Sequence, residues 1–225
     1  MECLNCNQEM PKNFSIFEFL VREKQEQGLC NNCKKDFILL KGKTCLGCAK
    51  LSEETYCEDC RSWQEKYPEY PFSHQALYQY NEAMKEYFAR YKFKGDYRLR
   101  YMFTHQIRQA LKKEKATLIP IPLSSERYLE RGFNQVEGFL DAARLDYVEA
   151  LIKKDDEQAQ SHKNKKERLT TKQPFLLKED MKHLLKDKEI IIVDDIYTTG
   201  RTLFHAYEEI QKSDPKSIRT FSLAR

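Results

Sequence analysis

One short segment constrains the fold of this chain more than any other. Residues 190–202 read IIIVDDIYTTGRT, in which β-branched residues precede two acids and a threonine-rich loop. Consecutive β-branched residues predict a buried parallel strand. The spacing of Leu203, Tyr207 and Ile210 predicts a helix after the loop. The segment therefore predicts a strand, a loop and a helix of an α/β fold.

The loop in this segment has the composition of an anion site. Backbone N–H groups at a helix start lack intrahelical partners and lie at the positive end of the helix dipole. Threonine hydroxyls add donors, and glycine allows close approach to the backbone. The carboxylates of Asp194 and Asp195 repel phosphate but suit ribose hydroxyls or Mg²⁺. We expect a sugar phosphate with vicinal hydroxyls; the alternative is a structural turn capped by Thr or Asp.

Eight cysteines form four CxxC pairs within the first 60 residues. Two CxxC turns supply one tetrahedral S₄ site, with no position left for water, so we expect two structural zinc sites. Neighbouring pairs are expected to combine, although an interleaved arrangement, a disulfide framework and a redox role stay open. The predicted ligands are Cys3, Cys6, Cys30 and Cys33 in one site, and Cys45, Cys48, Cys57 and Cys60 in the other.

Composition divides the chain into two predicted domains. Residues 1–66 form a cysteine-rich zinc-binding module, too small to bury much core, so metal binding would supply its folding energy. Pro68 and Pro71 mark a linker, and residues 73–225 form the second domain. The formal net charge is +4, and the basic excess lies in the second domain, which should therefore attract polyanions. Without a membrane span or signal peptide pattern, we expect a cytoplasmic protein with no membrane insertion.

Apolar periodicity predicts the other elements. Their alternation indicates a parallel sheet with helices on both faces, and with the ligand at the carboxyl ends of the strands. The expected segments are helices at 14–21, 77–91, 97–112 and 136–143, strands at 117–123, 147–152, 190–193 and 217–223, and a polar, lysine-rich stretch at 153–172.

Three segments carry a family resemblance: YKFKGD at 91–96, IPIPLSSERYLERGFNQ at 119–135, and the 190–202 segment. The last resembles the phosphoribosyl diphosphate (PRPP) motif of type I phosphoribosyltransferases. Together with the cysteines, the three resemble the ComF family of competence proteins. The resemblance implies a phosphoribosyltransferase-like domain behind a zinc-ribbon-like module. It also implies a cytoplasmic role in natural transformation, handling incoming single-stranded DNA beside a helicase-like ATPase.

The resemblance also assigns ligand residues. The two acids would hold the ribose of PRPP, with Mg²⁺ as a further ligand, and the threonine loop would hold its 5′-phosphate. An arginine after the 117–123 strand would bind diphosphate oxygens, for which a guanidinium is well suited. The predicted PRPP ligands are Asp194, Asp195, Thr198, Thr199, Gly200, Arg201, Thr202 and Arg131.

A basic segment with interleaved aromatic residues starts at residue 90. Basic side chains can follow a phosphate backbone and exposed aromatic rings can stack on bases, so single-stranded DNA is the predicted partner. The plainer alternative is a solvated charged face above core aromatics. The predicted nucleic-acid residues are Arg90, Lys92, Lys94, Arg98 and Arg100.

The sequence leaves other functions open. One is an active phosphoribosyltransferase on an unidentified small acceptor, for which no acceptor-specific residues are recognisable. Another is an adaptor whose zinc module docks a partner. The paired acids argue against an adaptor without any ligand site.

Overall fold

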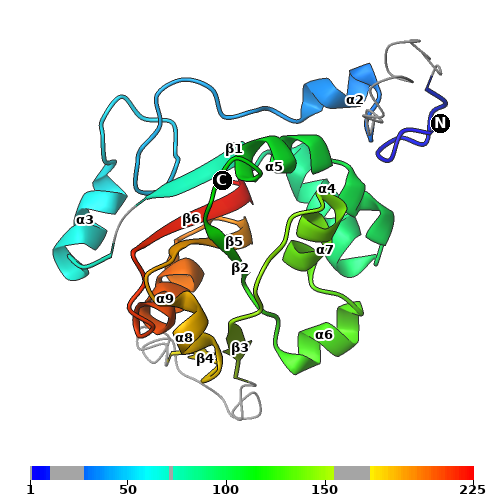
Figure 1. The fold of residues 1–225 in the computed structure, drawn as a ribbon. Coiled ribbons are helices and arrows are strands. Elements are labelled where there is room, and N and C mark those ends of the chain that lie inside the picture. Colours follow the sequence, from blue (N-terminus) through cyan, green and yellow to red (C-terminus); the bar gives the residue numbers. More distant parts are fainter. Residues whose placement is uncertain (1, 11–27, 71–72, 155–172) are drawn as a thin grey trace, which may run out of the picture.

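The computed structural model describes residues 2–10, 28–70, 73–154 and 173–225. In these residues a four-stranded sheet has the order β1-β6-β5-β2, and every neighbouring pair is parallel (Figure 1). The predicted α/β fold is confirmed. The strands are β1 (His74–Tyr78), β2 (Thr117–Pro120), β5 (Glu189–Ile196) and β6 (Ser217–Ala224).

Strand β5 is apolar because both of its faces are covered. Ile191 and Val193 pack into one hydrophobic core, and Ile190 and Ile192 pack into the other. Each of the four side chains is at most 3% exposed. A continuous β-branched run is what a strand buried on both faces requires, so the prediction for 190–193 is confirmed, and the strand extends through both acids to Ile196.

Helices lie on both faces of the sheet (Figure 1). Helices α4 (Glu82–Phe93), α5 (Thr104–Leu111) and α7 (Gln135–Ala142) contribute to one core, which we call the α4 core. Helix α9 (Arg201–Gln211) contributes to the other, the α9 core. The remaining elements are α2 (Asn31–Asp36), α3 (Glu58–Lys66), η1 (Tyr97–Tyr101), α6 (Ser125–Arg131), β3 (Leu151–Lys153), β4 (Phe175–Leu177) and α8 (Met181–Leu185).

The cysteine-rich segment runs along the β1 edge of the sheet (Figure 1). Leu39 forms an antiparallel bridge with Tyr78, and the His74 N–H donates to the Leu46 carbonyl at 3.0 Å. Its two halves join different cores. Cys3 and Cys33 belong to the α4 core, whereas the four cysteines from Cys45 to Cys60 belong to the α9 core.

Several predicted elements differ from the structure. Residues 74–78 form β1, which the sequence analysis missed, so the helical stripe expected from residue 77 begins only at Glu82. The expected 97–112 helix is divided into η1 and α5. The Asn81 side chain accepts from the Met84 N–H at 3.0 Å, and this cap fixes the start of α4.

The strand predicted at 147–152 was wrong in its extent and its sheet. Strand β3 covers only Leu151–Lys153 and pairs antiparallel with β4, apart from the main sheet. The helix expected at 14–21 and most of the lysine-rich stretch at 153–172 lie outside the described residues. Among the residues that are described, no helix combines the length and hydrophobicity needed to cross a membrane.

Candidate functional site

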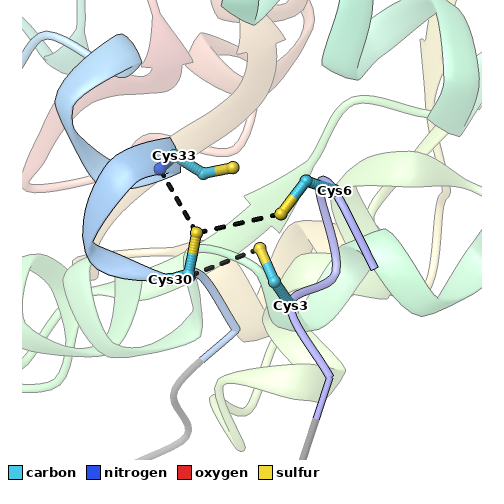
Figure 2. Close-up of side chains that lie close together, drawn as sticks. All are labelled: Cys3, Cys6, Cys30 and Cys33. Atoms are coloured by element: carbon cyan, nitrogen blue, oxygen red, sulfur yellow. Dashed lines mark hydrogen bonds between the residues drawn. The ribbon is translucent and has the colours of Figure 1, made fainter. Parts of the chain in front are cut away.

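The first cysteine tetrad consists of Cys3, Cys6, Cys30 and Cys33, whose side chains converge (Figure 2). Their sulfurs all lie within 4.8 Å of one another, and those of Cys6 and Cys30 are 3.8 Å apart. A tetrahedral zinc site with Zn–S bonds of about 2.3 Å places its sulfurs about 3.8 Å apart. The tetrad could therefore hold a zinc ion.

The second tetrad consists of Cys45, Cys48, Cys57 and Cys60, with the Cys48 and Cys57 sulfurs 3.7 Å apart. All four residues are buried. Neighbouring CxxC pairs thus combine, as predicted, and the interleaved arrangement is excluded. Each tetrad offers four sulfurs and could hold a metal ion in a closed site of the structural kind.

Backbone N–H groups prepare one sulfur of each tetrad to act as a thiolate. The Cys30 N–H donates to Cys3 Sγ, and the Cys57 N–H donates to Cys45 Sγ, both at 3.3 Å. Burial raises the pKa of Cys3, but backbone N–H groups, first that of Cys30, outweigh it and lower the pKa to about 6. The same balance lowers the pKa of Cys45 to about 7. Each tetrad thus contains a thiol prepared for the ionised form that binds metal.

The paired acids lie at the carboxyl end of β5. Asp194 Oδ1 accepts from the Asp195 N–H at 2.8 Å, and Asp195 Oδ2 lies 2.5 Å from Lys92 Nζ on α4. The side chains of Lys92 and Asp195 are each only 15% exposed. Burial, and then the charge of Asp195, raise the pKa of Asp194 to about 7. The pair is therefore a concentrated, partly neutralised negative charge, suited to hydroxyl donors or a cation.

The loop after these acids leads into α9. Gly200 has a φ of +78°, and a Cβ there would meet the hydroxyl of Tyr197. At the start of α9 the Thr199 hydroxyl accepts from the Arg201 N–H at 3.5 Å, and Thr198, Thr199 and Thr202 are exposed. The predicted phosphate loop therefore presents hydroxyl groups at a helix N-terminus.

Tyr197 connects this loop to the second tetrad. Its ring lies 4.4 Å from that of buried His74 and 5.1 Å from the Arg225 guanidinium carbon. Arg225 Nε donates to the Cys48 carbonyl at 2.9 Å, and its Nη2 lies 3.5 Å from Cys48 Sγ. Arg225 therefore contacts both Cys48, a candidate metal ligand, and Tyr197, whose hydroxyl lies against Gly200.

His74 was missed by the sequence analysis along with β1. Burial and the nearby Arg225 lower its pKa to about 3, so the imidazole is neutral at pH 7. Both of its ring nitrogens are hydrogen bonded, to Thr220 at 2.9 Å and to Ser222 at 3.0 Å. These bonds link β1 to β6 and give His74 a structural place beneath the loop.

Arg90, predicted to contact nucleic acid, is engaged inside the protein. Its guanidinium donates to the carbonyls of Leu4 and Asn5 at 3.1 and 2.9 Å and pairs with Asp96 at 3.3 Å. Leu4 and Asn5 form the turn between two ligands of the first tetrad. Arg90 therefore anchors that turn to α4.

Of the other predicted nucleic-acid residues, Lys92 lies at the acid pair, and Lys94, Arg98 and Arg100 lie apart from it. Lys92 faces Asp195, as described above, whereas the Lys94 side chain is exposed. Arg98 is 68% exposed and pairs with Asp96 at 3.0 Å. The Arg100 guanidinium carbon lies 3.9 Å from the Tyr97 ring centroid. The structure brings Lys92 to the acid pair, a link that its place in the YKFKGD segment alone did not reveal.

Arg131, the last residue of α6, lies within electrostatic range of the acid pair. Burial lowers its pKa, and the charge of Asp195 opposes that shift. Its Nη1 donates to Gln135 Oε1 at 2.7 Å, whereas its buried Nε has no hydrogen-bond partner in the described structure. A guanidinium within electrostatic range of Asp195 is consistent with the predicted oxyanion role, which stays a prediction.

Comparison with known proteins identifies the family of the chain. A model of the phosphoribosyl transferase domain matches residues 103–225. Over 226 residues the chain is 39% identical to Competence protein ComFC of Streptococcus pneumoniae (strain ATCC BAA-255 / R6), covering 100% of both chains. The chain belongs to the ComFC family of competence proteins. It is also 31% identical to Competence protein ComFC of Bacillus subtilis (strain 168), over 99% of this chain and 94% of that protein.

Two matches are more distant from this ComFC family member. Competence protein F of Haemophilus influenzae (strain ATCC 51907 / DSM 11121 / KW20 / Rd) is 24% identical over 87% of this chain and 96% of its own length. Among solved structures, the allosteric regulatory enzyme of purine biosynthesis matches with a TM-score of 0.34 and 12% identity. That match covers 54% of this chain and 25% of the other. A similarity at this level says nothing about function.

Proposed function

We propose that this protein acts in natural transformation in the cytoplasm, where it handles incoming single-stranded DNA beside a helicase-like ATPase. Its relatives at 39% and 31% identity are named as competence proteins and align along 100% and 94% of their length. Zinc in the two tetrads would hold the cysteine-rich segment against the sheet. The site at the end of β5 would bind PRPP or a related sugar phosphate.

The sugar-phosphate proposal rests on the acid pair, which ends β5 directly before the threonine loop and the start of α9. Asp194 and Asp195 would accept hydrogen bonds from vicinal ribose hydroxyls, or bind Mg²⁺. Thr198, Thr199 and the start of α9 would donate to the 5′-phosphate. Mg²⁺, when bound, would neutralise charge on the diphosphate. Lys92 would balance the charge of Asp195 through their ion pair.

The single-strand proposal rests on a surface at the end of α4. Lys94 and Arg98 are exposed there, and Phe93 and Tyr101 are 70% and 39% exposed. Cations near exposed rings suit a single strand, whose phosphates bind the cations and whose bases stack on the rings. Tyr91 and Phe103, from the same segment, are buried and belong to the core.

The first experiment is fluorescence anisotropy of a labelled single-stranded oligonucleotide across a salt series. We expect binding that weakens steeply with salt, with a slope reduced by about 1.4 in the Lys94→Ala/Arg98→Ala variant, since each phosphate contact contributes about 0.7 on single strands. Lys112 and Lys113 are also exposed, so Lys112→Ala/Lys113→Ala is the matched control. Absence of binding at low salt would exclude DNA handling by the isolated protein.

The sugar-phosphate site is tested separately by calorimetric titration of PRPP with Mg²⁺. Asp195→Asn should weaken binding at least tenfold, because it removes a charge from the acid pair and the partner of Lys92. Asp180→Asn makes the same change at an exposed position and should have no effect. Equal affinities of the two variants would refute the assignment.

An active phosphoribosyltransferase is the second candidate. The observation that favours it is a cavity lined by Arg131, where an acceptor has room. Release of diphosphate from PRPP in the presence of candidate acceptors, lost in Asp195→Asn, would establish turnover. Binding of PRPP without release of diphosphate would indicate that the site binds PRPP without catalysing transfer.

A further inference from the structure

Lys92 gives the acid pair a cation that belongs to the protein itself. Its Nζ lies 2.5 Å from Asp195 Oδ2, and the two side chains are each 15% exposed. The same ammonium also lies over the Phe88 ring, 4.7 Å from the ring centroid. Phe88 is buried, so a carboxylate and a packed aromatic ring both hold the ammonium in its place.

Two further cations act on the acids from other elements. Burial, and then the charge of Asp195, raise the pKa of Asp194, and the charges of Lys92 and of Lys153 on β3 oppose that rise. Arg131, at the end of α6, is within electrostatic range of Asp195. Three cations from three elements therefore act on two carboxylates, which leaves the pair with little attraction for an additional cation.

A divalent ion at Asp195 would need the space that Lys92 fills. Mg²⁺ lies about 2.1 Å from its ligand oxygens and usually keeps several of its waters. The Lys92 ammonium is in direct contact with Asp195 Oδ2, and little of this carboxylate is open to a hydrated ion. To bind there, the ion would have to displace the ammonium from a partly buried ion pair and leave that charge without its partner.

Sugar hydroxyls do not meet the same obstacle. An ionised carboxylate has about four acceptor sites, and one ammonium contact leaves the others unused. Asp195 can therefore stay paired with Lys92 and still accept hydrogen bonds from hydroxyl groups. The arrangement favours a neutral hydroxyl donor over a metal ion at the acids.

We infer that Lys92 takes the place of a divalent metal ion at Asp195, so that the acid pair binds sugar hydroxyls directly and without Mg²⁺. The inference rests on the proposed sugar-phosphate function, and it decides between the two ligands, hydroxyls and Mg²⁺, that the carboxylates alone would allow. It does not concern Mg²⁺ carried by the diphosphate of PRPP, because phosphate oxygens would hold that ion.

Manganese is the probe for the metal site, because it suits the same carboxylate ligands as Mg²⁺ and electron paramagnetic resonance measures its free concentration. Lys92→Met in the zinc-loaded, full-length protein should bind Mn²⁺ about tenfold more tightly than the unmodified protein, because the ammonium no longer opposes a cation at Asp195. The gain should disappear in Lys92→Met/Asp195→Asn. Lys85 is also ion-paired on α4, with Glu82 at 3.4 Å, but is 62% exposed. Lys85→Met is therefore the matched control and should leave the affinity for Mn²⁺ unchanged.

An unchanged affinity in Lys92→Met, or a gain that persists in the double variant, overturns the inference. Ribose 5-phosphate allows a second measurement on the unmodified protein, because it has the hydroxyls and the 5′-phosphate but no diphosphate. Calorimetric titration should give the same affinity with Mg²⁺ as in buffer depleted of divalent ions, prepared without a chelator that would remove zinc. Tighter binding with Mg²⁺ also overturns the inference. If neither ribose 5-phosphate nor PRPP binds, the sugar-phosphate function is refuted, and the manganese titrations still decide the role of Lys92.

Discussion

The first cysteine tetrad has one exposed ligand, Cys6, and one half-buried ligand, Cys30, whereas all four ligands of the second are buried. The first joins the α4 core through Cys3 and Cys33. Around the second, α3 packs on α9, with Tyr67 4.1 Å and Trp63 5.8 Å from the Phe204 ring. The first tetrad is thus partly exposed at the edge of the α4 core, whereas the second is buried within the α9 core.

The arginines that attach the two tetrads differ in the same way. Arg90 binds carbonyls in the turn of the first tetrad, and its hydrogen bonds in the described structure go to oxygen atoms. Arg225 reaches both the carbonyl and the sulfur of Cys48, and also lies against Tyr197 beneath the phosphate loop. We therefore expect damage to the second tetrad to reach the ligand site, and damage to the first to remain local.

The largest expected difference is between Cys60→Ser and Cys6→Ser. Cys60 is 2% exposed, so its loss leaves an incomplete metal site within a core, and should cost roughly 4–5 kcal/mol, or about 8–20 °C in Tm. Loss of the exposed Cys6 should lower Tm by less. Thermal melts by circular dichroism, with zinc content by mass spectrometry, measure both. Equal shifts in Tm would contradict the distinction between the partly exposed first tetrad and the buried second tetrad.

Metal removal should follow the same order. With excess chelator, zinc should leave in two kinetic phases, the faster from the first tetrad because a chelator can reach its exposed ligand, Cys6. A colorimetric zinc indicator follows the release. The Cys6→Ser variant should lack the fast phase, and a single phase of two equivalents in the unmodified protein would remove the basis for the comparison.

A smaller difference is expected between Arg225→Ala and Arg90→Ala. Each substitution removes charge-assisted hydrogen bonds, which contribute about 1.5–3 kcal/mol to the free energy of unfolding. Only Arg225→Ala should also weaken PRPP binding, by a few-fold, because Tyr197 then loses a neighbour beneath Gly200. Calorimetric titration of both variants decides. If Arg90→Ala weakened PRPP binding as much as Arg225→Ala, the first tetrad would influence the phosphate loop as strongly as the second.

A further difference is expected as a pH dependence on the α4 side, where Lys92 meets the acid pair. The pKa of Asp194 is about 7 in the folded protein, against 3.8 ordinarily. The folded state therefore holds a proton that the unfolded state releases, and this contribution to stability is lost as the pH rises from about 4 through 7. Urea unfolding at pH 5.5 and 8 should show a smaller loss in Asp194→Asn than in the unmodified protein. An identical loss in both would contradict the raised pKa.

The sequence predicted the features that depend on local pattern. The β5 strand and the start of α9 follow from consecutive β-branched residues and an apolar face, and the cysteine pairing follows from spacing. Strand β1 was missed because His74 and Gln75 interrupt its hydrophobic pattern. The His74 side chain is hydrogen bonded to Thr220 and Ser222, which lie 146 and 148 positions later in the chain.

The site was predictable in its parts and not in its connections. The acids and the threonine loop stood out as a motif, but the partner of Asp195 is a lysine from a helix 103 positions earlier in the numbering. Lys92 looked like one of several cations in a basic segment. Only the packing of α4 beside β5 separates it from Lys94, which is exposed two residues later.

The bond between Arg225 and Cys48 joins residues 177 positions apart. A ribosome therefore completes every cysteine of the second tetrad long before it adds the arginine that holds the tetrad to the sheet. Until β6 has been synthesised, β1 lacks the strand with which it pairs in the sheet, and such distant contacts form late. A nascent chain that acquires zinc early would keep its thiols protected from oxidation throughout that interval.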